Sequence, residues 1–207
     1  MPNRLRLTIF AALALAGAAV PASPASAALI ETSDCDGAEL SQPFQRWNDE
    51  RSYKLAPGGD AEGSLSGWSF SGGAKRVSGS EPFAATGSLG AASFAIPAGG
   101  SVTTAATCVN AAYPSFRFFV KSSGGLLGLL PAMTVSLVYR DGVLGLVEVP
   151  IGTVLPGSSW RPSPVMFTGA LAGAALAGGE ARLALRFRSI AGTWSVDDVF
   201  VDPYRRN

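Results

Sequence analysis

Four acidic side chains near opposite ends of the chain could hold one cation. They lie in segments 57–68 and 192–203 and are Asp60, Glu62, Asp197 and Asp198. If both segments are strands of one β-fold they can pair, which would bring the four carboxylates together. Carboxylates clustered in a half-buried place need a cation, and hard oxygen ligands suit calcium, so the sequence predicts a structural calcium site. The alternative is a solvated turn at Asp60 and Glu62, with one of the two aspartates bonded to backbone amides.

The first 27 residues are typical of a secretory signal peptide. Arg4 and Arg6 precede an apolar run over 7–20, and the small residues at 25–27 suit a cleavage site. The run is shorter than the roughly 20 apolar residues that span a bilayer, and an uncleaved anchor is the alternative. We therefore expect an extracellular protein with no membrane span after cleavage.

Cys35 and Cys108 are the only cysteines of the chain. In the oxidising environment that export implies, two cysteines are expected to pair. Closing this loop would contribute roughly 4 kcal/mol in the chain-entropy model and would tie the N-terminal segment to the rest of the fold. A reactive or metal-binding thiol pair is the alternative, but the chain offers no histidine and no close cysteine spacing to support it.

The charge balance and the lack of histidine argue against several function classes. Removing Arg4 and Arg6 from the 16 basic residues leaves 14 against 15 acidic ones, a net charge of −1, so nothing favours nucleic acid as a partner. Without histidine the chain lacks the commonest base for a nucleophilic serine and the commonest ligand of catalytic zinc. We expect no enzyme, and the alternative is a glycoside hydrolase, which needs only two carboxylates. The available ones are Glu39, Asp49, Glu50, Glu81 and Glu148.

Alternation of apolar and polar residues predicts an all-β fold. It covers segments 116–121, 134–140 and 182–188, in which one face of each strand would be buried. Glycine-rich turn signals separate such segments, and Asp141-Gly142 is typical of a short hairpin. Short strands at regular spacing predict a two-sheet antiparallel β-sandwich, or jelly roll, with at most short helical segments.

The length predicts one domain. We expect residues 28–207 to form a single β-sandwich with an N-terminal arm over 28–55, because this length is enough for one substantial core. Segment 41–55 carries aromatic residues among charges and could be a short helix or an extended arm that covers the core. The segment 170–177, rich in alanine and leucine, could form another short helix.

Two motifs resemble the galactose-binding-like jelly rolls, including carbohydrate-binding modules of families 4, 9 and 22. LAPGGDAEGSLSGWSFSGGA, over 55–74, is similar to their opening turn, and WSVDDVFVDP, over 194–203, looks like their closing strand. The chain also resembles a group of small secreted actinobacterial proteins through SQPF at 41–44 and RFF at 117–119.

The resemblance also implies an ion. Such modules often hold a structural calcium where the first and last strands meet, and by position Glu62 matches there with Asp197 or Asp198. The chain departs from the pattern at Ala61, where a phenylalanine is usual, and at Gly59, where Asn or Asp is common. Both departures weaken the match, because they remove a core side chain and a side-chain oxygen.

A carbohydrate-binding surface is the further implication of the resemblance. Sugar rings stack on exposed aromatic faces while polar side chains bind their hydroxyl groups. The candidate ligand-binding residues are Trp160, Phe119, Arg117 and Tyr139. Phe119 shares a strand face with Arg117 and Lys121, so it could face solvent between two bases. The alternative is that the tryptophans belong to the core, above all Trp68 and Trp194.

We therefore expect a secreted, monomeric, non-catalytic binding module whose partner is an extracellular or cell-envelope carbohydrate. The alternative is a structural envelope or matrix protein that contacts other proteins through the sandwich and has no sugar site. Aromatic and polar side chains gathered in one groove would favour a glycan, whereas a broad, flat apolar patch would favour a protein partner. Apart from calcium, no cofactor is expected.

Overall fold

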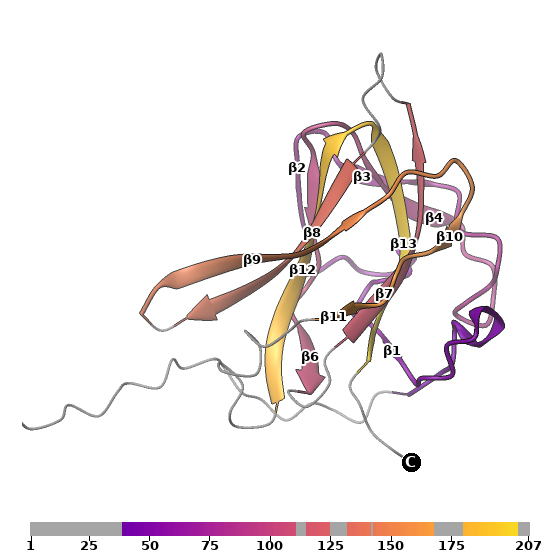
Figure 1. Ribbon diagram of the computed structural model, residues 1–207, viewed down its shortest axis with the longest axis horizontal. Coiled ribbons are helices and arrows are strands. Elements are labelled where there is room, and N and C mark those ends of the chain that lie inside the picture. The colour runs from indigo at the N-terminus through magenta and orange to yellow at the C-terminus, as the bar shows by residue number, and fades with distance from the viewer. Residues whose placement is uncertain (1–38, 111–114, 125–131, 142, 168–179, 203–207) are drawn as a thin grey trace, which may run out of the picture.

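The protein is a sandwich of two antiparallel β-sheets (Figure 1), so the predicted all-β architecture is confirmed. Its computed structural model describes residues 39–110, 115–124, 132–141, 143–167 and 180–202. Within these residues the helical content is one short 3-10 turn, η1 (Gln45–Trp47). None of the described segments forms a helix long and apolar enough to cross a membrane.

One layer is a seven-stranded sheet with the order β10-β7-β13-β4-β3, in which β1 also pairs with β13 and β11 with β7. The C-terminal strand β13 lies inside this sheet, between β7 and β4. The strands are β1 (Lys54–Leu55), β3 (Lys75–Ser78), β4 (Ala92–Ile96), β7 (Ser115–Ser123), β10 (Arg161–Pro162), β11 (Met166–Phe167) and β13 (Thr193–Asp202).

The other layer is a six-stranded sheet with the order β2-β5-β12-β8-β9, in which β6 also pairs with β12. Strands β8 and β9 form a hairpin that extends beyond the body of the sandwich (Figure 1), and Asp141 pairs with Gly145 near its tip. The hairpin predicted after Asp141 is therefore confirmed. The strands are β2 (Ser69–Ser71), β5 (Ser101–Thr103), β6 (Thr107–Asn110), β8 (Ala132–Asp141), β9 (Gly145–Val154) and β12 (Glu180–Ala191).

The main core lies between the two sheets, and the predicted alternation supplies it. Phe118 of β7, Leu137 of β8 and Phe187 of β12 all point inward, and the rings of Phe118 and Phe187 meet edge to face at 4.8 Å. Trp194 is fully buried there, as expected. The chain changes sheet between β4 and β5, β7 and β8, and β12 and β13, which is the connectivity expected of a jelly roll.

The first and last segments lie side by side, as predicted, but the strand that pairs is β1 (Lys54–Leu55), whereas the predicted segment 57–68 forms turns and contains no strand. Leu55 of β1 pairs with Phe200 of β13, and beyond the strand the Ala56 N–H donates to the Val199 carbonyl at 2.8 Å. Gly59 passes so close that a Cβ there would lie 2.7 Å from the Val199 carbonyl oxygen. Only glycine fits this approach, so the motif glycine has a packing reason.

The described part of the N-terminal arm, 39–55, covers the outer face of the seven-stranded sheet. It doubles back on itself, since Ser41 and Tyr53 exchange two backbone hydrogen bonds of 2.9 and 2.8 Å. Phe44 and Tyr53 form a second buried cluster with Phe119 and Phe200. The arm thus combines both predicted alternatives, a short helical turn within an extended segment, whereas segments 1–38 and 170–177 lie outside the described residues.

Candidate functional site

A row of arginines lies on the outer face of the six-stranded sheet. Because Leu183, Leu185 and Phe187 of β12 face the core, the alternating residues of the strand point outward. The adjacent strands β5 and β2 contribute hydroxyl groups to the same face. The outward polar residues are Arg182, Arg186 and Arg188 on β12, Ser101 and Thr103 on β5, and Ser69 and Ser71 on β2.

Two adjoining depressions cross this face. One, of about 400 Å³, is lined at its far end by Phe70 and Arg188. The other, of about 440 Å³, is lined by Tyr139 and Arg140. Both share the same three lining residues, so we treat them together as the arginine groove; these are Ser69, Thr103 and Arg186. Each depression falls within the size range of ligand-binding clefts, roughly 300–1,000 Å³.

Arg186 is held in place at the centre of the arginine groove. Its Nε donates to Thr103 Oγ1 at 2.9 Å, and its Nη1 donates to a carboxylate oxygen of Glu148 on β9. Arg140 and Arg188 have no hydrogen-bond or ion-pair partner among the described residues. The groove therefore offers one fixed guanidinium group and further exposed ones to a ligand.

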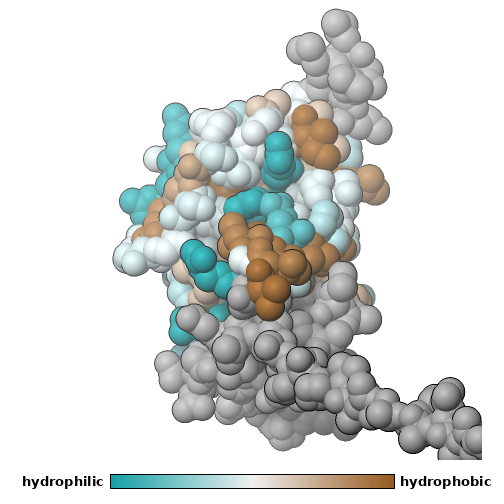
Figure 2. Space-filling model, turned by 90° about the vertical axis from the view of Figure 1, so that its left-hand side faces the viewer, coloured by the Kyte–Doolittle hydropathy of each residue, from teal (hydrophilic) through white to brown (hydrophobic). Residues whose placement is uncertain are grey.

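An apolar ridge lies beside this groove. In Figure 2, hydrophilic residues (teal) gather in the middle of the face and hydrophobic residues (brown) project next to them. The tip of the β8–β9 hairpin contributes Val143, Leu144 and Leu146, of which Leu144 is 74% exposed. Leu146 also lines the groove, so the ridge forms part of its wall.

Most of the predicted ligand-binding residues lie on the opposite face, and the structure corrects their proposed exposure. Phe119 does share a strand face with Arg117 and Lys121, but Phe119 is fully buried. The ring of Phe44 stacks on it at 5.3 Å. The arm thus occupies the place that a sugar would take on this aromatic ring. Tyr139 alone of the four borders the arginine groove, and it also packs partly against the main core.

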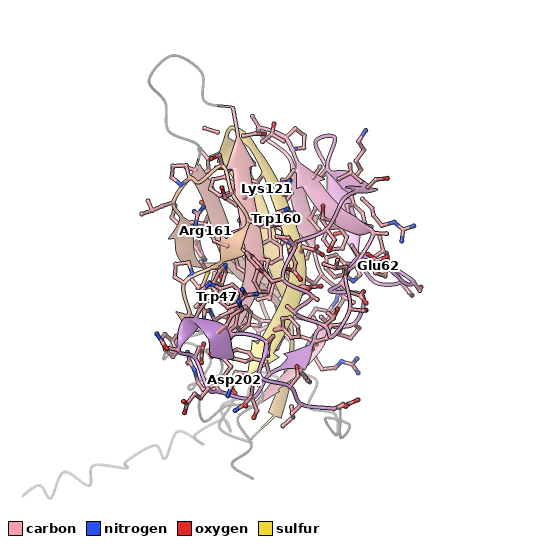
Figure 3. The ribbon with its side chains drawn as sticks, turned by 90° about the vertical axis from the view of Figure 1, so that its right-hand side faces the viewer. Trp47, Glu62, Lys121, Trp160, Arg161 and Asp202 are labelled. Carbon is pink, nitrogen blue, oxygen red and sulfur yellow. The ribbon has the colours of Figure 1, made fainter. Side chains whose placement is uncertain are left out.

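Trp160 is partly exposed at the edge of the covered face. The Lys121 ammonium group lies 4.7 Å from the centre of its ring, and both residues are labelled in Figure 3. The contact is a cation–π interaction of the kind that contributes about 0.5–1 kcal/mol at exposed sites. Trp160 also packs against the second buried cluster. It therefore contributes to the packing of the covered face.

Arg117 belongs to a buried ion-pair network under the arm. Its Nη1 donates to Asp49 Oδ2 at 2.8 Å, and Nε and Nη2 both donate to the Ser163 carbonyl. Burial alone would raise the pKa of Asp49, but hydrogen bonds from Arg51, Tyr53 and Arg117 outweigh it and lower the pKa to about 2. The depression of about 600 Å³ beside them is lined by Asp49, by Arg51 and Arg117, and by the exposed Glu50, so its positive and negative charges balance.

The four predicted calcium ligands do not converge into one set. Glu62 Oε1 accepts hydrogen bonds from the backbone N–H groups of Ala91 and Ala92, at 2.6 and 2.8 Å, and Asp60 Oδ1 accepts from the Glu62 N–H. The described residues contain no group of three or more acidic, histidine or cysteine side chains placed to hold a metal. Asp60 thus matches the alternative of a turn-capping residue, and calcium binding stays a prediction.

Glu81 takes the place expected of Glu62 beside the two aspartates. Asp197 accepts hydrogen bonds from the Glu81 N–H at 2.9 Å and the Ser80 hydroxyl at 2.8 Å, while the carboxylate of Glu81 accepts from the N–H groups of Phe83 and Ala85. Glu81, Asp197 and Asp198 are all buried. We call these three residues the carboxylate cluster.

Burial dominates the electrostatics of the carboxylate cluster. It raises the pKa of Asp197 to about 6, although hydrogen bonds from Glu81, Ser80 and Asp198 oppose the shift. It raises the pKa of Asp198 further, to about 9, because the charges of Asp197 and Glu81 add to it. Asp198 also has a left-handed backbone, with φ of 45°, at a bulge in the pairing of β13 with β7. The cluster therefore favours a bound proton or another positive charge.

Some of the remaining predicted site residues lie in the described part of the chain and some lie outside it. Cys108 lies on β6, but Cys35 lies outside the described residues, so the disulfide stays a prediction. Of the candidate hydrolase carboxylates, Asp49 and Glu148 are ion-paired and Glu81 is bonded to backbone amides. Each of these three is held by a neighbour within the protein.

The chain matches no family model and no curated protein sequence. Among solved structures it is similar to the CBM22-1 and GH10 modules of Clostridium thermocellum xylanase 10B in complex with xylohexaose, at 15% identity and a TM-score of 0.45; the match covers 70% of this chain and 28% of that chain. It is also similar to the CBM22-1 xylan-binding domain of Paenibacillus barcinonensis Xyn10C, at 15% identity and a TM-score of 0.42, covering 68% of this chain and 88% of that one.

A third similar structure is the family 11 carbohydrate-binding module of Clostridium thermocellum in complex with a β-1,3-1,4-mixed-linked tetrasaccharide, at 14% identity and a TM-score of 0.43, covering 75% of this chain and 98% of that one. The resemblance to carbohydrate-binding modules predicted from the sequence motifs is thus found among solved structures. At TM-scores below 0.5 these likenesses identify neither a ligand nor binding residues for this chain. The likeness to secreted actinobacterial proteins stays a prediction.

The arginine groove was not predicted, although its signal is visible in the sequence. Residues 182–188 alternate arginine or alanine with core residues, which places the arginines on one outer strand face. What the sequence does not reveal is that the neighbouring strands are β5 and β8, which come from distant segments. Glu81 was missed as a neighbour of Asp197 for the same reason, because 116 residues separate them.

Proposed function

We propose that the protein is a secreted, non-catalytic glycan-binding module whose binding surface is the arginine groove. A concave surface with hydroxyl and guanidinium groups can satisfy the many hydroxyl groups of a sugar chain. Phe70, on the edge strand β2, pairs with the core residue Val102 and packs 5.9 Å from the ring of Phe94, but it is 37% exposed and borders one end of the groove, where its exposed edge can contact a sugar ring. The single observation that carries the proposal is the open groove in which a fixed Arg186 lies among hydroxyl groups, with Phe70 at its border.

The covered state of the other outer face supports the same choice. There the arm already stacks Phe44 on Phe119 and pairs Asp49 with Arg117. A ligand at that position would have to displace the arm and leave Arg117 without its partner, and breaking a buried ion pair costs about 3–5 kcal/mol. The arginine groove needs no such displacement.

The test compares two exposed phenylalanines on opposite sheets. Phe70→Ala removes the ring that lines the groove, and Phe167→Ala removes a ring that is 60% exposed on β11 of the other sheet. The secreted protein and both variants are tested on a glycan array and by affinity electrophoresis in polysaccharide gels. We expect binding that Phe70→Ala weakens about tenfold, the loss that one stacking contact represents, and that Phe167→Ala leaves unchanged. No binding to any glycan at high protein concentration would refute the proposal.

The second candidate function is a structural envelope or matrix protein that binds another protein. The exposed apolar tip formed by Val143, Leu144 and Leu146 favours it, because exposed apolar residues that gather in one place mark contact surfaces. The tip is narrow and borders a polar groove, whereas a protein interface needs a broad surface. We therefore rank this function below glycan binding.

A further inference from the structure

We propose that the arginine groove selects acidic glycans, whose carboxylate or sulfate groups bind its guanidinium groups. This inference rests on the proposed function, since it names the class of glycan bound at the same site. It starts from a contrast in charge. The mature chain is almost neutral, yet four arginines, Arg140, Arg182, Arg186 and Arg188, line the groove.

No acidic side chain lines either depression among the described residues. Glu148, the acidic residue next to them on β9, is paired with Arg186. Arg182 has an interaction of its own, so the excess of positive charge among the described residues rests on Arg140 and Arg188. Local positive charge of this kind raises the concentration of anions at the surface and selects against cations.

The sheet register places the arginines at regular intervals. Arg186 and Arg188 alternate on β12, about 7 Å apart along the strand. The pairing of β12 with β8 extends to Ala184 and Val138; beyond it Arg182 pairs with Cys108 of β6, while Arg140 lies on the β8–β9 hairpin, and both arginines border the same depression.

Guanidinium groups are chemically matched to planar or tetrahedral anions. Arginine donates two parallel hydrogen bonds to one carboxylate, and such charge-assisted bonds are about twice as strong as neutral ones. The hydroxyl groups of Ser69, Ser101 and Thr103 can also bond the uncharged positions of a sugar ring, since a hydroxyl group that accepts one hydrogen bond can still donate another. A neutral glycan would use the hydroxyl groups but would leave the arginine charges without function.

Single-stranded nucleic acid is the other polyanion that such a groove could attract. Its binding sites stack successive bases on several aromatic rings, whereas Phe70 is the one exposed aromatic ring that the described residues place in the groove. The observations therefore favour an acidic polysaccharide, and nucleic acid serves as an outcome of the test.

The experiment uses acidic polysaccharides and their neutral derivatives. Polygalacturonate, alginate and hyaluronan are each compared with the same polymer after reduction of its carboxyl groups to alcohols, with single-stranded DNA as a competitor. We expect at least one acidic polymer to bind about tenfold or more tightly than its reduced form, with affinity that falls as salt rises.

The variants distinguish binding at the arginine groove from a general attraction of polyanions to positive charge on the protein. Arg140→Gln combined with Arg188→Gln should lower the affinity for the acidic polymer about tenfold or more. Arg46→Gln removes an exposed arginine from the other side of the molecule and should leave it unchanged. Equal binding of acidic and reduced polymers would overturn this inference but leave glycan binding intact. Equal binding of DNA, or an equal loss in Arg46→Gln, would also overturn it, whereas no binding to any polymer would refute the proposed function itself.

Discussion

The two outer faces of the sandwich are built alike but are used differently. On β7 the outward residues include Arg117 and Phe119, and on β12 they include Arg186 and Arg188. The arm covers the first pair, so that Arg117 is buried beside Asp49. Nothing in the described residues covers the second pair, and Arg188 is exposed.

The difference shows that outward alternation on a strand does not by itself make a surface available to a ligand. An arginine covered by apolar rings needs a charged partner, because an unpaired buried charge is costly. Asp49 supplies that partner together with Tyr53, whose hydroxyl group donates to it at 2.8 Å. The covered face therefore contributes to stability, and the open face is the one that we propose for binding.

The largest expected effect comes from opening the covered face. Phe44 is fully buried among Phe119, Tyr53 and Phe200. Phe44→Ala should lower the free energy of unfolding by about 3–5 kcal/mol, the usual loss for a buried phenylalanine. Denaturant unfolding at fixed temperature measures it.

The matched control is Phe70→Ala on the open face, for which we expect a loss of about 1 kcal/mol or less, because its ring is partly exposed. Folded Phe44→Ala protein should still bind glycan, whereas Phe70→Ala should not bind normally. Equal losses of stability in the two variants would contradict the division of roles between the faces.

The sequence predicts what depends on local pattern. Alternation located the strands around Phe118, Leu137 and Phe187, and the two end motifs located the pairing of β1 with β13. Both follow from the period of a strand and from turn residues, which are local properties. The same alternation placed Phe119 on the outer face, as the structure confirms.

Exposure could not be predicted, because it depends on segments far apart in the chain. Phe119 lies on the predicted face but is buried by Phe44, which comes 75 residues earlier. Glu62 lies in the predicted motif but is bonded to Ala91 and Ala92. In each case the local sequence predicted the position of the residue in its own segment. It did not predict which residue from a distant segment would contact it.

A smaller effect is expected from the carboxylate cluster beneath the covered face. A carboxyl group whose pKa is raised by folding binds its proton more tightly in the folded protein, so its stabilising effect is complete below the ordinary value of 3.8 and is lost as pH rises toward the folded value. For Asp197 that window extends from about pH 4 to about pH 6, and for Asp198 it extends from about pH 4 to about pH 9. Without metal, the melting temperature should fall across this window.

Asp198→Asn should flatten this fall, since a neutral amide needs no proton and asparagine tolerates the left-handed backbone at this position. The expected gain near pH 9 is at least about 1 kcal/mol, because one unit of pKa corresponds to ~1.4 kcal/mol. Asp60→Asn, in the neighbouring turn, is the control and should leave most of the fall in melting temperature with rising pH. A fall that is unchanged in Asp198→Asn would refute this account of the cluster.

The sequence predicts calcium at Asp60, Glu62, Asp197 and Asp198, so a calcium ion bound there would compete with the proton for the two aspartates that this prediction shares with the carboxylate cluster. Added calcium should then raise the melting temperature of the wild-type protein above that in chelator, more at about pH 9 than at about pH 4. The gain should be smaller in Asp198→Asn, which has lost a carboxylate. Identical melting temperatures in calcium and in chelator at the higher pH would remove calcium from this site and leave the proton as the compensating charge.

The smallest effect is expected at the apolar tip, which separates the two candidate functions of the open face. Leu144→Ser should change the free energy of unfolding by no more than about 0.5 kcal/mol, because the side chain is 74% exposed. Glycan affinity should also remain as in the wild type, since the ring of Phe70 and the groups around Arg186 are untouched.

Leu155→Ser, a substitution of a leucine that is 75% exposed after β9, provides the control for a general change in surface polarity. If Leu144→Ser but not Leu155→Ser abolished retention of the protein at the cell envelope while glycan binding stayed intact, the tip would act as a protein contact, and the open face would carry both functions on adjoining surfaces.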